Sequence, residues 1–181
     1  MTENEETTLQ EAAAQQQNFS FGKLLFSGFI KFIYIIAFFA LVNIFISSSY
    51  VVGTSMNDTL HDGEYLLGVR TPFTKLKRGD IVNVKHDGSI VVKRLIGLAG
   101  DVVEINEEQG LLVNGIPFKV DQQGSNESIF GKWEVSDGHV FIIGDNRSNS
   151  KDSRIYGEVP VKDVVCKVFF RYYPFYVWGG L

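Results

Sequence analysis

The sequence predicts a mainly β protein, in which antiparallel sheets form a partly closed, barrel-like domain preceded by one membrane-spanning helix. Two observations support this fold class. A single long apolar run, residues 24–46, lies near the N-terminus, and no later segment keeps helical periodicity. After the run, short β-rich segments alternate with turn signals, which is typical of antiparallel sheets. Partial closure is expected because it reduces the number of exposed strand edges.

Length, charge and cysteine content limit the class of protein. At 181 residues, the chain has room for one compact domain and an anchor. Residues 47–181 carry 15 basic and 17 acidic residues, and this near-neutral balance argues against nucleic acid as a partner. Cys166 is the only cysteine, and there is no His-x₃-His or glycine-rich phosphate loop. We therefore expect no metal and no cofactor, while the oligomeric state stays open.

The N-terminal part predicts a single-pass anchor. Residues 1–22 are rich in Glu, Gln and Thr and predict a disordered cytoplasmic tail. Residues 23–46 predict a transmembrane helix, because the run can cross a hydrocarbon core of about 30 Å and exceeds the apolar core of a cleavable signal. A buried core helix is the alternative. Lys23 and Lys31 lie at its N-terminal end and no Lys or Arg follows before Arg70, so the positive-inside rule places the rest outside the cell membrane.

Residues 47–181 predict an extracytoplasmic β domain. Residues 47–49, three serines, resemble a signal cleavage site but are interpreted as a linker. Asn114-Gly115 is typical of a two-residue hairpin turn. Residues from about 104 to 138 are expected to form a smaller β insertion in the main sheet. Eight strands are predicted, at residues 64–70, 80–85, 90–95, 101–105, 111–113, 116–120, 140–143 and 164–173.

Four segments carry the residues suited to chemistry: 53–60 (GTSMNDTL), 78–82 (RGDIV), 92–101 (VKRLIGLAGD) and 144–154 (GDNRSNSKDSR). Their order, spacing and position after one apolar run resemble the type I signal peptidases, and the single-span form typical of Gram-positive bacteria fits best. The resemblance covers the chain from the run to about Tyr173. It implies a membrane-bound serine endopeptidase that removes signal peptides from secretory preproteins after a small-residue, Ala-x-Ala-like site.

Ser55 and Lys93 are the expected nucleophile and general base. A serine hydroxyl is a weak nucleophile and needs a base to take its proton. Lysine can serve if it is neutral, and burial favours the neutral form. Strand alternation puts Lys93 on one face with Val91 and Leu95, and the resemblance assigns the base to Lys93. The three histidines are interpreted as exposed loop residues: His61, His86 and His139.

The resemblance also implies supporting roles around this pair. The N–H of Ser55 is expected to stabilise the oxyanion, with Gly53 permitting the tight backbone geometry. Some members carry a hydroxyl residue in place of Gly53, so that side-chain donor is absent here. Ser150 is expected to orient the lysine. The expected substrate pocket contains Met56, Leu60 and Val92. The expected structural charges are Arg94, Asp145, Asp152 and Arg154.

Two other functions compete with this reading. A non-catalytic assembly factor, such as the peptidase-like proteins of pilus biogenesis, is expected to lack the serine or the lysine, and both are present. A self-cleaving repressor of the related Ser/Lys β-fold is disfavoured by the apolar span and the missing DNA-binding helices. Formal glycosylation sequons inside two of the four segments favour a bacterial source, because a glycan there would obstruct the site. The precursor repertoire, and whether this is a main or an accessory peptidase, stay open.

Asp58 and Ala99 stand where the family usually has proline. A carboxylate within about 6 Å of Lys93 raises the pKa of the lysine and weakens the base. We expect instead that Asp58 faces the rim of the site and influences substrate choice more than base strength. The pH profile of kcat/KM should therefore keep its lower pKa in Asp58→Asn, with Asp58→Pro testing loop stiffness separately. A shift of about one full pKa unit in Asp58→Asn would place the carboxylate beside Lys93.

Overall fold

A computed structural model describes residues 3–57, 59–119 and 129–181, with side chains from residue 23 onward. Asp58 and part of the polar stretch of the predicted insertion lie outside the described residues. The chain divides into two compact units, Met1–Ile44 and Phe45–Leu181. All of the described residues proposed for chemistry belong to the second unit.

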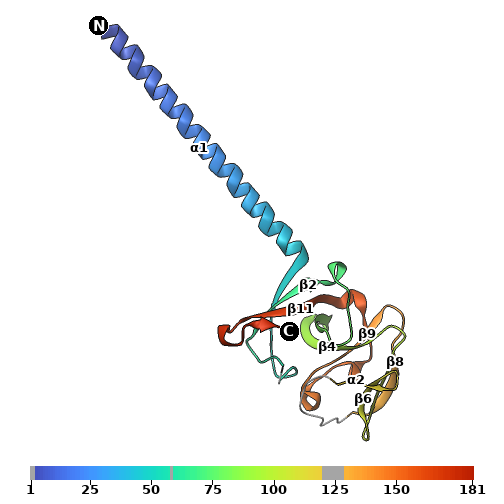
Figure 1. Ribbon diagram of the computed structural model, residues 1–181. Coiled ribbons are helices and arrows are strands. Elements are labelled where there is room, and N and C mark those ends of the chain that lie inside the picture. Colours follow the sequence, from blue (N-terminus) through green and yellow to red (C-terminus); the bar gives the residue numbers. More distant parts are fainter. Residues whose placement is uncertain (1–2, 58, 120–128) are drawn as a thin grey trace. The chain divides into compact units, whose positions relative to one another are not determined.

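Helix α1 spans Glu3–Phe45 (Figure 1). It begins within residues 1–22, where the sequence predicted a disordered tail, and the Ala, Gln and Glu residues there have high helix propensity. The part Lys23–Phe45 is long and apolar enough, by length and composition, to cross a membrane. A core helix would be buried, yet no residue of its most apolar window is buried. The membrane span over this part of α1 stays a prediction.

The larger sheet of Phe45–Leu181 has eight strands in the order β1-β2-β11-β3-β4-β9-β10, with β12 paired to β11. All of its pairings are antiparallel, as the sequence predicted. This strand path has two ends, and no closed barrel is found in the part of the chain that the structure describes. The strands are β1 (Ile46–Tyr50), β2 (Tyr65–Arg70), β3 (Ile81–His86), β4 (Ser89–Leu98), β9 (His139–Ile143), β10 (Val159–Pro160), β11 (Val164–Tyr173) and β12 (Gly179–Gly180).

The smaller sheet, of which β6 and β8 are labelled in Figure 1, has the order β7-β6-β5-β8. Asn114 and Gly115 connect β6 to β7 with φ values of 55° and 76°. Positive φ at both positions is what a type I′ hairpin turn requires, so the predicted hairpin is confirmed. The strands are β5 (Val102–Asn106), β6 (Gly110–Val113), β7 (Ile116–Pro117) and β8 (Gly131–Glu134).

All eight predicted strands have an observed counterpart, but the sequence missed four others. The predicted linker at residues 47–49 is wrong, because these serines form the middle of β1 and pair with β2. Side-chain hydrogen bonds support them: Ser48 Oγ lies 2.9 Å from the Tyr172 hydroxyl, and Asn83 Nδ2 donates to Ser49 Oγ at 2.7 Å. The other missed strands, β8, β10 and β12, are short. The remaining helical turns are η1 (Thr71–Phe73), η2 (Arg147–Asn149), α2 (Ser153–Tyr156), η3 (Val161–Asp163) and η4 (Phe175–Val177).

Two buried clusters position the site. The first joins the two sheets, since Phe141 and Ile143 of β9 pack with Val103 and Ile105 of β5. The second lies under the β1–β2 connection and contains Val51, Met56, Leu60, Leu66, Ile81, Val92 and Val168. The connection that carries Ser55 is thereby packed onto the larger sheet rather than left as a mobile loop.

Phe141 is fully buried where the two sheets meet, so its truncation should destabilise the whole second unit. Phe141→Ala is expected to lower the free energy of unfolding by about 3–5 kcal/mol, through lost burial and the cavity left behind. Thermal unfolding of the detergent-solubilised chain provides the measurement. Ile116→Ala is the matched control, because Ile116 is 69% exposed and should change stability by less than about 0.5 kcal/mol. Equal effects of the two variants would contradict the placement of the core.

Candidate active site

Ser55 lies in the connection between β1 and β2, which is closed at its base by backbone hydrogen bonds. Val51 N donates to Glu64 O at 2.8 Å. Gly53 has a φ of +82°, a conformation that side chains disfavour, and its N–H donates to Asp62 Oδ1 at 2.7 Å. The expected role of Gly53 in a tight turn before the serine thus has a structural basis.

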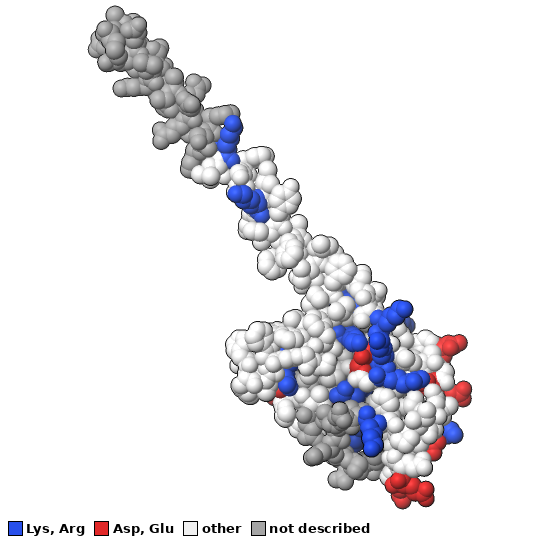
Figure 2. Space-filling model, viewed as in Figure 1, with Lys and Arg blue, Asp and Glu red and all other residues white. Residues whose placement is uncertain are grey.

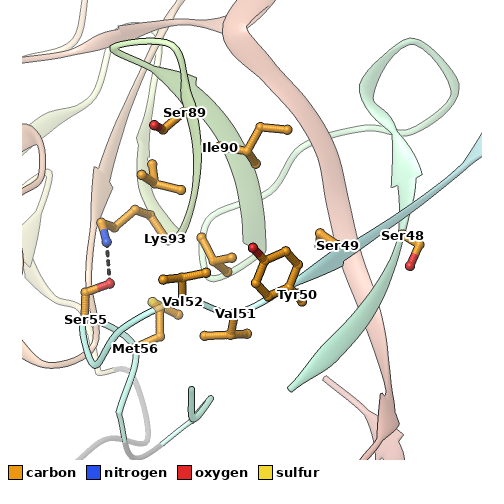
Figure 3. A pocket seen from close by; sticks show the side chains of 12 residues that line it. Ser48, Ser49, Tyr50, Val51, Val52, Ser55, Met56, Ser89, Ile90 and Lys93 are labelled. Atoms are coloured by element: carbon orange, nitrogen blue, oxygen red, sulfur yellow. Dashed lines mark hydrogen bonds between the residues drawn. The ribbon is translucent and has the colours of Figure 1, made fainter. Parts of the chain in front are cut away.

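Lys93 lies on β4, and its side chain reaches Ser55 in the connection between β1 and β2. The Lys93 Nζ and Ser55 Oγ atoms are hydrogen-bonded at 2.6 Å, and Figure 3 shows the two side chains pointing at each other. Lys93 is only 4% exposed. Burial lowers the pKa of Lys93 below its ordinary value, although the nearby negative charges of Asp152 and Asp145 act in the opposite direction. The environment therefore favours the neutral amine that a lysine base needs.

The expected charged residues form two ion pairs beside the lysine, of which Arg154–Asp152 is buried and Arg94–Asp145 is part-buried. Arg94 holds Asp145 through two bonds, Nε to Oδ1 at 2.8 Å and Nη2 to Oδ2 at 2.7 Å. Arg154 holds Asp152 in the same way, at 2.8 and 2.9 Å. Asp152 Oδ2 also accepts from the Gly144 N–H at 2.9 Å. Such charge-assisted, bidentate hydrogen bonds fix the relative orientation of the guanidinium and carboxylate planes as well as their distance.

The Ser150 hydroxyl is buried, but the structure does not give it the expected hydrogen bond to Lys93. Its Oγ has no hydrogen-bond partner. The hydroxyl lies so close to Gly144 that a Cβ there would clash with it and also with the Ser55 carbonyl oxygen, 2.5 Å away. Ser150 therefore lies in the immediate surroundings of Ser55, and its close packing on Gly144 explains why only glycine fits at residue 144.

Two asparagines hold the backbone before Ser55, and the sequence reasoning did not single them out. Asn146 donates from its backbone N to Ser55 O at 3.0 Å and from Nδ2 to Thr54 O at 3.0 Å. Asn149 Nδ2 donates to Thr54 Oγ1 at 2.7 Å. Both belong to the 144–154 segment, so their amide groups were a readable signal. They connect the segment with the structural charges to the segment with the serine.

Thr59 makes hydrogen bonds through both its hydroxyl and its carbonyl oxygen, and the sequence did not predict either of them. Its hydroxyl donates to Asp145 Oδ2 at 2.5 Å. Its carbonyl oxygen accepts from Arg171 Nη1 at 3.2 Å, and Arg171 is paired with buried Glu64 at 3.0 Å. Glu64 and Arg171 lie outside the four segments and 107 residues apart, so no local pattern could have paired them. Together these contacts fix the turn that follows Ser55.

A cleft of about 610 Å³ runs from the Ser55–Lys93 pair along two strand segments. Residues 48–52 form one wall and residues 89–93 the other, with Ser48 and Ser49 at the end away from Lys93 (Figure 3). The β4–β9 pairing begins only at Arg94, so residues 89–93 have a strand partner on one side alone. The cleft thus lies beside an open strand edge, where an extended peptide can add as a strand.

Two of the three residues expected in the substrate pocket line this cleft. Met56 is 1% exposed and Val92 is 8% exposed, and both face the cleft near the serine. Leu60 is fully buried and does not line it, but packs in the same cluster as Met56. Leu60 therefore supports the wall from behind.

The three histidines make no hydrogen bond with Ser55 or Lys93 in the part of the chain that the structure describes. The side chain of His61 is 63% exposed, as the sequence predicted, whereas His86 stacks on Tyr156 with ring centroids 4.0 Å apart. The side chains of His86 and His139 are each about one-third exposed. Among the described residues, no group of three or more His, Cys, Asp or Glu side chains could hold a metal ion. Among the hydrogen bonds between described residues, the only one to the Ser55 hydroxyl comes from Lys93.

A buried lysine bonded to a serine at the end of a cleft with an open strand edge is the arrangement expected of a serine peptidase. The comparison with known families agrees, since residues 26–173 match the family described as signal peptidase, peptidase S26. The chain therefore belongs to the signal peptidases of family S26. The predicted activity, removal of signal peptides, is confirmed at this level.

Individual relatives cover most of the chain. Signal peptidase I of Bacillus licheniformis is 38% identical over 152 residues, covering 75% of this chain and 81% of the relative. Signal peptidase I T of Bacillus subtilis is 32% identical over 194 residues, covering 97% of this chain and 96% of the relative. A crystal structure of a signal peptidase I from Enterococcus faecalis is 31% identical and covers 52% of this chain and 97% of that chain, with a TM-score of 0.45.

The lowered pKa of Lys93 predicts a characteristic dependence of stability on pH. Between the folded-state pKa and the unfolded value of about 10.4, the unfolded chain binds more protons, so this residue makes stability rise with pH. Lys93→Met removes that dependence. The variant should therefore gain stability relative to wild type near pH 6.5, and the gain should shrink towards about pH 9.5.

Thermal unfolding at the two pH values measures this difference. Lys85→Met is the matched control, because Lys85 is an exposed strand lysine and its replacement should give no pH-dependent difference. A difference between wild type and Lys93→Met that stayed constant with pH would mean that burial does not lower the pKa of Lys93.

Proposed function

We propose that Ser55 is the nucleophile and Lys93 the general base of this signal peptidase, and that it cuts preproteins after a small residue at the outer face of the cell membrane. The observation that carries the assignment is the 2.6 Å hydrogen bond between Lys93 Nζ and Ser55 Oγ, made by a lysine that is 4% exposed. At an ordinary pKa of about 10.4, holding a lysine neutral at pH 7 costs about 4.6 kcal/mol. Burial of Lys93 reduces this cost.

The reaction follows the usual course of acyl transfer. Neutral Lys93 takes the proton of Ser55 Oγ as that oxygen attacks the scissile carbonyl carbon, and the backbone N–H of Ser55 stabilises the oxyanion. The C–N bond then breaks, and the Lys93 ammonium gives its proton to the leaving amine. A water molecule attacks the resulting ester with Lys93 again as base, which releases the signal peptide and regenerates Ser55.

The surroundings of the pair support this course. The Arg94–Asp145 and Arg154–Asp152 pairs fix the segment beside Lys93, and Gly53 sets the backbone before the serine. Ser150 is proposed to orient the lysine, because its buried hydroxyl lacks a partner and an unpartnered buried hydroxyl costs about 1–3 kcal/mol. A lysine ammonium formed during the reaction would supply one.

The cleft accounts for the kind of substrate. An extended segment of the preprotein can pair with the open edge of residues 89–93. Met56 and Val92 form the apolar wall of the cleft near Ser55, and Leu60 packs behind that wall. The space left beside Ser55 suits alanine-sized side chains. The scheme needs no cofactor, and the near-neutral net charge of residues 47–181 argues against nucleic acid as a partner.

The proposed topology places the site beside its substrate. Residues 1–22 form the cytoplasmic tail, residues 23–46 span the bilayer, and residues 47–181 form the extracytoplasmic peptidase domain with a smaller insertion at about 104–138. The apolar part of α1 and its N-terminal lysines support this arrangement. Preproteins that carry a signal peptide in the same bilayer then present their cleavage site on the outer side.

Ser55→Ala and Lys93→Ala should each abolish cleavage, and the double variant should be little worse, because nucleophile and base act as a unit. The assay incubates the detergent-solubilised full chain with a precursor that carries an Ala-x-Ala site. His61→Ala is the control and should keep wild-type activity, since the side chain of His61 is 63% exposed. Retained activity in Lys93→Ala, together with its loss in any histidine variant, would overturn the Ser/Lys assignment.

A further inference from the structure

The connection between β2 and β3, residues 71–80, combines an exposed aromatic ring with several basic side chains. Together with Arg70, it contains Lys75, Lys77 and Arg78, and no acidic residue occurs from residue 65 to residue 79. The surrounding unit is slightly acidic overall, so this is a local excess of positive charge. Figure 2 shows Lys and Arg side chains gathered on one face of the unit Phe45–Leu181, with most of the visible acidic side chains towards its margin.

Strand register places this connection at the end of the sheet where the domain begins. Ile46, the first residue of β1, is paired with Val69, and β2 ends one residue later. The Phe73 ring packs against the Phe45 ring with centroids 4.4 Å apart, within the unit Phe45–Leu181. Phe45 is the last residue of α1, so the connection adjoins the point at which the chain leaves the proposed span.

The connection is held firmly but keeps its outward side chains available. Thr71 Oγ1 donates to Val164 O at 2.5 Å, and Gly79 N donates to Leu95 O at 2.8 Å. Phe73 remains 48% exposed in spite of its contact with Phe45. Such a segment presents its side chains in a fixed arrangement.

Two of the basic side chains have no acidic partner. Arg78 is bound to Asp101, and the carboxylate of Asp80 is bound to Lys167. Lys75 and Lys77 are exposed, and no carboxylate among residues 23–57, 59–119 and 129–181 lies within ion-pair distance of either ammonium group. Two free ammonium groups beside an exposed aromatic ring are suited to an anionic surface rather than to a partner within the chain.

We propose that residues 71–78 bind anionic lipid headgroups of the bilayer that α1 crosses, with Lys75 and Lys77 supplying the charge and Phe73 the interfacial ring. The proposal rests on the proposed membrane span. A basic residue near an anionic membrane surface contributes about fivefold to binding, and aromatic rings favour the headgroup level. The same contact holds the start of β1, and with it the Ser48–Tyr50 wall of the cleft, at the membrane surface.

The test uses the full chain in vesicles of phosphatidylcholine, with or without phosphatidylglycerol. Cys166 is fully buried, so an environment-sensitive thiol label attached to the folded protein reports on one introduced cysteine, with unmutated protein as the blank. Thr74→Cys reports on the connection and leaves its ring and lysines in place. Gln109→Cys, in the exposed turn between β5 and β6, is the control, and Ile35→Cys reports on the span.

The label at residue 74 should become shielded only when phosphatidylglycerol is present, and high salt should reverse this. In the Thr74→Cys background, Lys75→Gln with Lys77→Gln should lower the ratio of bound to free loop by roughly fivefold per lysine, whereas Lys75→Arg with Lys77→Arg should preserve it. The label at residue 109 should not respond.

Two different failures can be told apart. A label at residue 35 that stays in water would show that the proposed span is wrong, and the inference would fall with it. If the label at residue 35 lies in lipid but the label at residue 74 does not respond to phosphatidylglycerol, or responds equally after the glutamine substitutions, the headgroup contact alone is overturned. Loss of the response in the arginine variant would equally overturn it, because the charge is retained there.

Discussion

The burial of one amine, the side chain of Lys93, is the constraint on which the rest of the site depends. A lysine can act as a base near neutral pH only if its charged form is disfavoured, and removal from water is the means available here. The same burial makes the lysine a source of instability whenever it is protonated. The packing of β4 between β3 and β9, and the cluster under the β1–β2 connection, hold Lys93 in place against that tendency.

The charged residues around Lys93 have to be paired for the same reason. Asp145 and Asp152 both act to raise the pKa of Lys93, which would weaken the base. Each carboxylate is engaged by an arginine through two hydrogen bonds, and the positive charge of Arg154 lowers the pKa of Lys93, opposing the carboxylates. The carboxylates can then serve as rigid acceptors, for the Thr59 hydroxyl and for the Gly144 N–H.

The sequence predicted those parts of the structure that depend on local pattern. Alternating apolar residues and turn signals located eight strands and the hairpin at Asn114-Gly115, and the resemblance to the signal peptidases paired Ser55 with Lys93. It failed for β1, because a run of serines has no β signal and is ordered only by pairing with β2 and by bonds from Asn83 and Tyr172. The Glu64–Arg171 pair could not be predicted, because it arises from strand packing between residues 107 positions apart in the sequence. The hydrogen bond expected for Ser150 came from the family resemblance alone, and the structure leaves that hydroxyl without a partner.

The open strand edge at residues 89–93 shows how function and fold compete in this protein. Unpaired strand edges promote association between chains, and closure into a barrel would remove them. Here β4 pairs with β9 only from Arg94 onward, so the edge beside Lys93 stays free for an extended peptide. Ser89 and Ile90 are exposed along this edge, while Val92 and Lys93 are buried. Full closure of the sheet would cover residues 89–93, the segment proposed to pair with the substrate, so the open edge is what leaves the proposed site accessible.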